Sequence, residues 1–190
     1  MSEVTTENRD FQRIDFSQDV FQKGEYEKCN FDHCVFSNSD LSNVVFTECK
    51  FNNCNFSMAK ITNISFKDSK FKDCKLLGLR FDECNKFGFS VEFESCQLNL
   101  STFYKQNLKN SKFKDSSLRE VDFTESNLTN VIFNKCDLSG AIFKSTLLEK
   151  SDFRTSYNYS IDPELNRIKK AKFSLTGVIG LLDKYDIQIE

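Results

Sequence analysis

The stretch of sequence that decides the fold runs from Phe93 to Phe143. Divided into fives, it reads FESCQ LNLST FYKQN LKNSK FKDSS LREVD FTESN LTNVI FNKCD LSGAI F. Each group opens with Phe or Leu in strict alternation. An earlier array with the same step runs from Phe11 to Phe81, and every one of its opening residues is also large and apolar. A repeat this regular over most of the chain predicts a repeat architecture.

The five-residue step excludes a uniform helix or strand. It matches neither the helical period of about 3.6 nor the strand period of 2, so either element would scatter these side chains. A backbone that turns a corner every five residues sends every fifth side chain inward. Four corners close a coil of about 20 residues, and such coils stack about 4.8 Å apart through backbone hydrogen bonds. No single coil buries its apolar centre, so the coils need one another.

A 20-residue coil makes a further prediction about the inward residues. One face should carry a single column, and that column consists entirely of phenylalanine: Phe11, Phe31, Phe51, Phe71, Phe93, Phe113, Phe133 and Phe153. Equal side chains fill equal layers without voids. Stacked aromatic neighbours add about 0.5–1.5 kcal/mol per pair. We therefore expect this column to form the core stack.

We call the large apolar residue that opens each group of five its centre. Small residues recur two positions before each centre, where an inward-facing corner leaves little room. All eight cysteines occupy this position: Cys29, Cys34, Cys49, Cys54, Cys74, Cys84, Cys96 and Cys136. The spacing of Cys29 and Cys34 superficially resembles a zinc motif. The shared register favours another interpretation, in which the thiols are small buried core residues. We expect them to be reduced, with no bound metal.

The repeating unit resembles a known family. Ser39-Asp40-Leu41, Ser126-Asn127-Leu128 and Cys136-Asp137-Leu138 are similar to the consensus of pentapeptide-repeat proteins, which is close to Ala-Asp/Asn-Leu-x-x. This resemblance implies an all-β fold, a right-handed quadrilateral β-helix with a short C-terminal helical cap. The repeat pattern predicts an N-terminal tail over 1–8, the β-helix over 9–155 and a C-terminal cap or dimerisation segment over 156–190.

The register breaks at 84–90. Twelve residues, where ten would fit, separate Phe81 from Phe93. The two extra residues indicate either a tolerated bulge or a short recognition loop, and either Phe87 or Phe89 would replace the missing centre. The candidate residues for binding a partner are Lys86, Phe87, Gly88, Glu92 and Glu94.

The tail after Phe153 carries helix signals. Asp162-Pro163-Glu164 is typical of a helix start, and Ser174 is a candidate N-cap for a second helix. The closing segment 180–187, Gly-Leu-Leu-Asp-Lys-Tyr-Asp-Ile, resembles the tail of quinolone-resistance proteins of the Qnr and MfpA type, which implies a homodimer joined end to end at the C-terminus. The residues expected to cap the coil or form the dimer are Leu175, Val178, Ile179, Leu182, Tyr185, Ile187 and Ile189.

Composition narrows the function. The net charge is −2 and the pI is about 5.6, so no direct nucleic-acid binding is expected. No apolar stretch is long enough for a membrane helix, and the first residues lack an apolar signal segment, which predicts a cytoplasmic protein. The chain has one histidine, His33, at an outward position, and no glycine-rich phosphate loop. We expect neither catalysis nor a cofactor.

Two functional hypotheses follow. The first is a non-enzymatic protein-binding scaffold of unknown partner. The alternative, implied by the resemblance of the tail, is a DNA-mimicking modulator of DNA gyrase or topoisomerase IV that protects against quinolones. The summed formal charges of the four faces lie between about −1 and +2. Because duplex DNA carries a charge every ~1.7 Å, electrostatic mimicry by these faces is weak.

Overall fold

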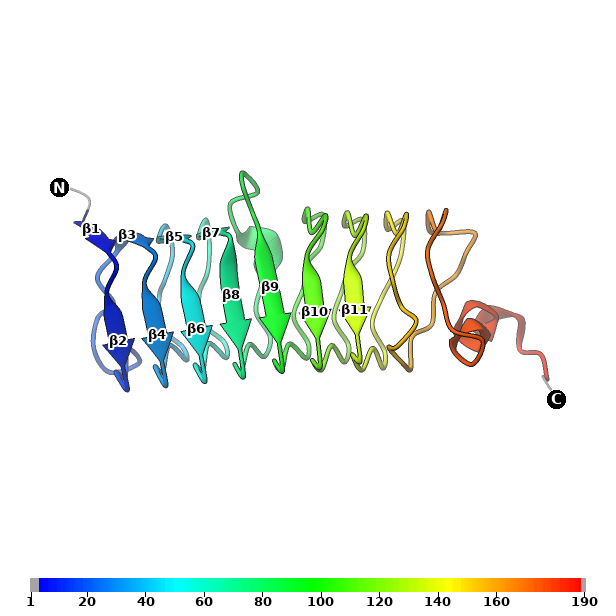
Figure 1. Cartoon of the computed structure of the whole chain (residues 1–190), viewed down its shortest axis with the longest axis horizontal. Helices are drawn as coiled ribbons and strands as arrows, with labels where there is room; N and C mark the ends of the chain where they lie inside the picture. Colours follow the sequence, from blue (N-terminus) through cyan, green and yellow to red (C-terminus); the bar gives the residue numbers. More distant parts are fainter. Residues whose placement is uncertain (1–3, 189–190) are drawn as a thin grey trace.

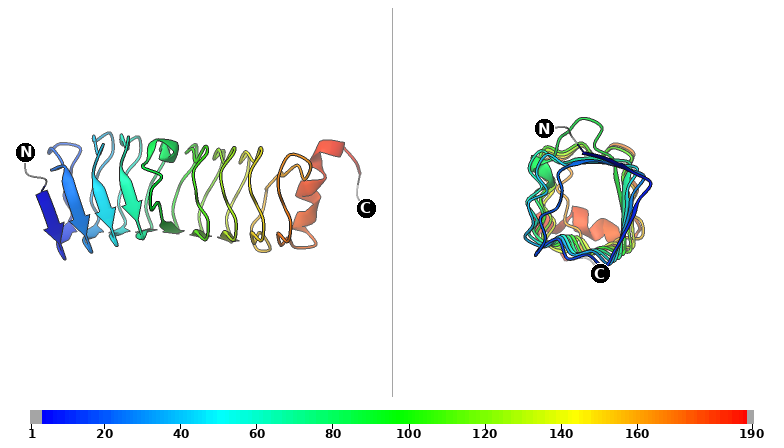
Figure 2. Two further views of the ribbon diagram at one scale, coloured as in Figure 1. Left: turned by 90° about the horizontal axis from the view of Figure 1, so that it is seen from above. Right: turned by 90° about the vertical axis from the view of Figure 1, so that its left-hand side faces the viewer.

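The chain winds into a four-sided coil whose turns stack along one axis. The structure is a computed structural model and describes residues 4–188. The two ends of the chain lie at opposite ends of the rod (Figure 1), and the view along the rod shows a square outline (Figure 2). The fold is the predicted all-β right-handed quadrilateral β-helix, built from parallel sheets with almost no helix.

Two of the four faces carry parallel sheets, one of seven strands and one of four strands confined to residues 4–67. The four-stranded sheet contains, in spatial order, β1 (Val4–Glu7), β3 (Gly24–Glu27), β5 (Val45–Thr47) and β7 (Ser65–Lys67). The seven-stranded sheet contains β11 (Ile132–Asn134), β10 (Lys112–Lys114), β9 (Val91–Glu94), β8 (Ser69–Lys72), β6 (Lys50–Asn52), β4 (Asn30–Asp32) and β2 (Asp10–Gln12). Single bridges between successive coils join the other two faces. Three short 3-10 helices complete the chain: η1 (Phe81–Glu83), η2 (Gly177–Leu181) and η3 (Asp183–Tyr185).

The eight phenylalanines of the expected core stack lie in one column behind the seven-stranded sheet. Phe11 and Phe31 stack with ring centroids 4.7 Å apart, and Phe133 and Phe153 repeat the arrangement at 4.8 Å. A ninth member, Phe173, stacks on Phe153 at 5.4 Å with nearly parallel rings. The column therefore runs through the whole rod, and each aromatic pair adds about 0.5–1.5 kcal/mol to the burial of the rings.

The coils begin earlier than the expected boundary. β1 pairs in parallel with β3 over the whole of Val4–Glu7, so residues 4–8 belong to the first coil, whereas the sequence predicted a tail. The apolar pattern does not reach this far because Thr6, and not an apolar residue, stands opposite Tyr26. Backbone pairing alone extends the coil here.

The coils also continue beyond 155. Leu147 pairs with Arg167, and Asp152 pairs with Lys172. Ile168 and Phe173 keep the five-residue step from Phe153 and pack against the core. The step is hidden in the sequence because polar Asn158 and Pro163 fall on the two intermediate positions. Tyr159 and Ile161 are the apolar side chains buried there.

The corners of the coil depend on left-handed backbone. The residue two positions after each centre has positive φ in nearly every coil, for example 52° at His33, 53° at Glu48 and 62° at Leu100. One residue in this conformation reverses the local curvature of the chain and makes the corner. Asparagine and aspartate tolerate it better than other non-glycine residues, yet leucine, methionine, lysine and glutamate also occupy corners in this protein.

All eight cysteines are buried and free, as their register predicted. Four of them, Cys34, Cys54, Cys74 and Cys96, occupy the same corner of successive coils. The Cys54 thiol donates to the backbone oxygen of Phe31 in the preceding coil at 3.4 Å, and Cys74 donates equivalently to Phe51 at 3.3 Å. The thiols thus satisfy inward carbonyl groups while filling little volume.

Candidate interaction surfaces

The register break forms a protruding loop between η1 and β9. It rises from the side of the rod next to β8 and β9 (Figure 1). Phe89 turns inward and is buried, with its ring 6.4 Å from the ring of Phe81. Phe87 turns outward and is 82% exposed. Phe89 therefore fills the missing centre, and Phe87 is the large apolar residue left in solvent.

Hydrogen bonds hold both ends of this loop. The Asn85 backbone N–H donates to Ile64 at 2.8 Å, and Ser90 donates to Phe66 at 2.9 Å, which preserves the stacking of coils on either side. The Asn85 side-chain oxygen accepts from the Phe87 N–H at 3.0 Å. This local turn fixes the direction in which the Phe87 side chain leaves the rod.

Gly88 completes the turn in a left-handed conformation, with φ of +71°. On the far side of the loop, the Ser90 hydroxyl donates to the Asp68 carboxylate at 2.8 Å. Lys86, Phe87 and Gly88 are all exposed. These three candidate residues form the tip of an ordered loop, which we call the Phe87 loop and define as residues 85–88.

Glu92 and Glu94 lie apart from the tip, on the outer face of β9. Lys70 and Lys112 contact the Glu92 carboxylate at 3.4 and 3.1 Å, and Lys114 contacts Glu94 at 2.8 Å. Although partial burial opposes the effect, the hydrogen bond from Lys112 and the charge of Lys70 hold the pKa of Glu92 below its usual value. The structure places these glutamates in a neutralised lysine ladder, so they present no separate acidic patch.

The C-terminal cap is a pair of 3-10 helices lying across the end of the rod (Figure 2). No helix starts at Asp162-Pro163-Glu164, where the sequence predicted one. The Asp162 carboxylate accepts from the Glu164 N–H at 2.8 Å and makes a turn. The N-cap residue of η2 is Thr176. The predicted Ser174 lies two residues earlier, and its hydroxyl oxygen accepts from the Gly177 N–H at 2.9 Å.

Side chains other than the predicted ones cover the core. Ile168, Phe173 and Leu181 pack against the buried cluster. Leu182 is half-buried. The remaining predicted cap residues are exposed: Leu175, Val178, Ile179, Tyr185 and Ile187. Ile189 lies outside the described residues. The end of the rod thus carries an apolar outer surface, most fully at Leu175, which is 93% exposed.

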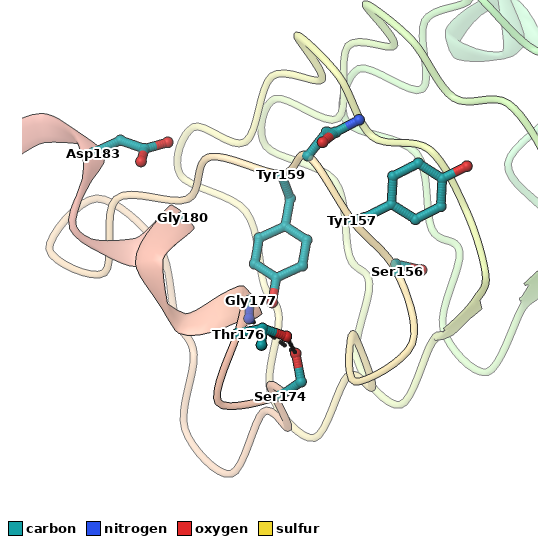
Figure 3. A pocket seen from close by; sticks show the side chains of 9 residues that line it. Ser156, Tyr157, Tyr159, Ser174, Thr176, Gly177, Gly180 and Asp183 are labelled. Atoms are coloured by element: carbon teal, nitrogen blue, oxygen red, sulfur yellow. Dashed lines mark hydrogen bonds between the residues drawn. The ribbon is translucent and has the colours of Figure 1, made fainter. Parts of the chain in front are cut away.

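Tyr159 anchors the cap to the last coil. Its ring points at Gly177 beside Ser174 and Thr176 (Figure 3). A Cβ atom at Gly177 would clash with the Tyr159 hydroxyl, and one at Gly180 would clash with the Tyr159 backbone oxygen. Within residues 4–188 the buried hydroxyl has no hydrogen-bond partner, and burial raises the pKa of Tyr159. Only glycine at both positions permits this approach.

Charged contacts fix the outer edge of the cap. The Lys184 ammonium contacts the carboxylates of Asp162 and Glu164, each at 2.8 Å. The Tyr185 hydroxyl donates to Glu164 at 3.0 Å. The hydrogen bonds that the Lys184 ammonium donates to the two carboxylates raise the pKa of Lys184 above its usual value. The cap is therefore held in one orientation on the rod.

Metal-binding clusters and membrane-spanning helices are both absent from the part of the chain that the structure describes. Within residues 4–188, no three His, Cys, Asp or Glu side chains are placed to hold a metal ion. His33 lies on the surface and contacts Asp32 at 2.9 Å. Among the described segments, no helix has the length and apolarity to cross a membrane. The features of the molecule that can contact another molecule are on its outer surface.

The chain is a repeat protein, a β-helical rod with a filled core and an ordered, exposed loop. The side chains that another molecule could contact lie on its outer surface. The chain belongs to the pentapeptide-repeat family: the family model described as "Pentapeptide repeat region" matches residues 9–85 and 88–159. The two residues between the matched segments are Lys86 and Phe87, at the tip of the Phe87 loop. No curated protein sequence matches the chain.

Solved structures share the fold. QnrB1, a plasmid-mediated fluoroquinolone resistance protein, is similar with a TM-score of 0.62 at 15% identity, over 97% of this chain and all of QnrB1. HetL, a pentapeptide-repeat protein involved in heterocyst differentiation regulation in the cyanobacterium Nostoc sp. strain PCC 7120, gives 0.67 at 12% identity, over 92% of this chain and 90% of HetL. At these identities the similarity concerns the fold.

Proposed function

We propose that this protein is a non-enzymatic scaffold that binds a protein partner through the Phe87 loop. The observation that carries the proposal is the outward Phe87 ring, which is 82% exposed at the tip of a hydrogen-bonded loop. Aromatic side chains are typical anchors of protein interfaces. A loop already ordered in the free protein loses little conformational entropy on binding.

The rest of the fold supports a scaffold. The core is filled with aromatic, leucine and cysteine side chains, so it offers no interior site for a substrate. QnrB1 and HetL have this fold and different described roles, which fits the general rule that function belongs to surface sites and not to the fold. The identity of the partner must therefore be sought on the outer surface.

We also propose that two copies join through the cap. Leu175, Val178 and Ile179 leave an apolar surface at the end of the rod, and covering it with a second copy removes it from water. The eight free thiols fit a reducing compartment, which supports a cytoplasmic location. Sedimentation at tens of micromolar tests the dimer: Val178→Asp with Ile179→Asp is expected to give monomers. A monomeric unmodified protein contradicts the proposal.

The second candidate is modulation of DNA gyrase or topoisomerase IV, as a DNA mimic that protects against quinolones. The specific observation in its favour is the charge of the first coils. Residues 4–48 contain nine Asp and Glu and four Lys and Arg, a net charge of −5. The sum of charges over each face conceals this acidic end, because each face runs along the rod and its acidic and basic residues cancel in the sum. An acidic end on a rod fits a positively charged DNA-binding groove.

One experiment addresses the scaffold proposal and its partner site. Protein captured from lysate of the source organism on the immobilised chain is compared for wild type, Phe87→Ser and a matched control. Ile142→Ser is the control because Ile142 is an exposed apolar residue on another part of the rod. We expect the specifically captured partner to be lost with Phe87→Ser and retained with Ile142→Ser. Equal capture by all three proteins would contradict a role for the loop.

A second experiment tests the topoisomerase candidate. Supercoiling by gyrase from the source organism is measured with ciprofloxacin, with and without micromolar protein. Protection that Phe87→Ser abolishes and Ile142→Ser preserves supports this candidate. If the protein neither protects nor inhibits supercoiling, the topoisomerase candidate is wrong, and the capture experiment still decides the scaffold proposal.

A further inference from the structure

Positive charge gathers at one corner of the last two coils. The segment 167–172 reads RIKKAK, and it stacks on the coil that contains Lys150. We define the basic corner as Lys150, Arg167, Lys169, Lys170 and Lys172. All five residues are exposed.

Backbone hydrogen bonds fix these residues relative to one another. The Lys150 N–H donates to the Lys169 oxygen at 3.0 Å, and the Phe153 N–H donates to the Lys172 oxygen at 2.8 Å. Lys150 and Lys170 both have left-handed backbone, with φ of 61° and 60°. They occupy the same corner in successive coils. Their Cα atoms are thus separated by about one coil spacing of 4.8 Å. The five cations are held on rigid backbone within two adjacent coils.

Two carboxylates, Asp152 and Glu149, neighbour these cations, but within residues 4–188 no salt bridge joins either of them to the five. Asp152 is contacted by Arg154 at 2.7 Å and pairs through its backbone with Lys172. The hydrogen bond from Arg154 and the charge of Lys172 both lower the pKa of Asp152. The lysine ladder on β8 and β10 differs, because the carboxylates of Glu92 and Glu94 lie between its cations.

We propose that the basic corner binds the phosphate backbone of duplex DNA without regard to sequence. Lysine and arginine are the side chains that contact phosphates, and Arg167 can donate two hydrogen bonds to one phosphate group. The corner presents five cations beside two carboxylates, Glu149 and Asp152. None of the five side chains is aromatic, so the corner offers no ring on which single-stranded bases stack. A duplex offers a dense, regular row of charges to such a surface.

The overall charge of −2 does not argue against this contact. The negative excess lies in residues 4–48, at the opposite end of the rod from the basic corner. At physiological ionic strength, charges more than about 8 Å apart in solvent are largely screened. The basic corner therefore acts on a ligand through its local charge, which the net charge of the chain conceals.

The test is fluorescence anisotropy of a labelled 20-base-pair duplex of arbitrary sequence, titrated with the full chain at several NaCl concentrations. Five phosphate contacts predict a slope of log K against log salt of about −4.5, with Kd on the order of 10⁻⁶–10⁻⁴ M at physiological salt. The triple variant Lys150→Gln, Lys169→Gln, Lys170→Gln should reduce the slope to about −2. The control triple Lys50→Gln, Lys75→Gln, Lys109→Gln removes the same charge from three earlier coils of the rod and should leave the slope nearly unchanged.

Three results would overturn the proposal. The first is no binding at 50 mM NaCl. The second is an equal loss of affinity in both triple variants, which would mean that total charge alone governs binding. The third is displacement of the duplex by poly-glutamate at equal charge concentration, which would assign the corner to an acidic protein. All six lysines are exposed, so both triple variants should fold. Circular dichroism and thermal melting of each variant check this.

Discussion

Phe87 and Phe89 are two residues apart and point in opposite directions from the rod. The Phe89 ring lies 6.4 Å from that of Phe81 inside the coil, whereas Phe87 is 82% exposed. The sequence left open which of the two fills the missing centre. Their opposite placement separates stability from binding within one loop, because one ring supports the core and the other is available to a partner.

The first prediction uses this separation. Phe89→Ala should lower the free energy of unfolding by about 3–5 kcal/mol, because it removes a buried ring and leaves a cavity. Phe87→Ala should change it by less than about 0.5 kcal/mol, because the ring packs against little. Urea denaturation followed by circular dichroism measures both. Similar losses in the two variants would show that the assignment of the rings is wrong.

The regular five-residue step explains which parts of the fold could be predicted from the sequence. The five-residue step specifies which side chains face inward, so it predicted the coil, the phenylalanine column and the burial of all eight cysteines. It could not place the first strand, where Thr6 stands in an apolar column, or the last coil, where Asn158 and Pro163 interrupt the step. In both places backbone hydrogen bonds between coils continue without an apolar signal.

Surface sites were harder to predict because outward residues carry no periodic constraint. Glu92 and Glu94 are acidic in sequence, but residues 20 positions away, in the next coil, neutralise them. The basic corner is likewise assembled from two coils. The cap residues were chosen by helical spacing, whereas Gly177–Leu181 form a 3-10 helix that turns a different set of side chains toward the core. The charge and exposure of these surface residues depend on which residues of neighbouring coils lie side by side.

The second prediction concerns the left-handed corners. Leu100 has φ of 62°, a conformation that costs most L-residues about 1–2 kcal/mol and that asparagine adopts more readily. Leu100→Asn should therefore stabilise the protein by about 0.5–1 kcal/mol, since the Leu100 side chain is largely exposed and little packing is lost. Asn38 occupies the equivalent corner with φ of 58°, so Asn38→Leu is the matched control and should destabilise by a similar amount. Thermal melting that shifts in the same direction for both variants would contradict this account.

The third prediction is a loss of stability in alkali. Burial raises the pKa of Cys49 from 9.0 to about 12 and that of Cys136 to about 11. Above pH 9 these thiols ionise in the unfolded chain while they stay protonated in the folded one. The unfolded state then binds fewer protons, so stability is fully present below pH 9 and falls as pH rises. Each thiol contributes on the order of 1 kcal/mol per pH unit between about pH 9 and 11.

Urea midpoints at pH 7.5, 9 and 10 measure this effect. The variant Cys49→Ala with Cys136→Ala should be less stable at pH 7.5, because it leaves two small cavities. Its stability should nevertheless fall less steeply above pH 9 than that of the unmodified protein, because two of the titrating groups are gone. The tyrosine Tyr26, whose pKa burial raises to about 12, is present in both proteins and cancels in the comparison. Equal slopes would show that these thiols are not protected from ionisation by the fold.

The last prediction tests the contact between Tyr159 and the two glycines of the cap. Gly177→Ala should weaken the cap because its Cβ atom would clash with the Tyr159 hydroxyl, and Gly180→Ala should weaken it because its Cβ atom would clash with the Tyr159 backbone oxygen. Tyr159→Phe removes a buried hydroxyl that has no partner among the described residues, so this change should be neutral or stabilise the protein by up to about 1–3 kcal/mol. Combining it with each alanine separates the two clashes. Tyr159→Phe should partly rescue Gly177→Ala, because it removes the most severe clash and leaves the tight contacts with Ser174 Oγ and the ring, and should not rescue Gly180→Ala, because the backbone oxygen remains. Amide hydrogen exchange of residues 174–188 reports the opening of the cap directly, and equal rescue of both alanine variants would contradict the geometry of this contact.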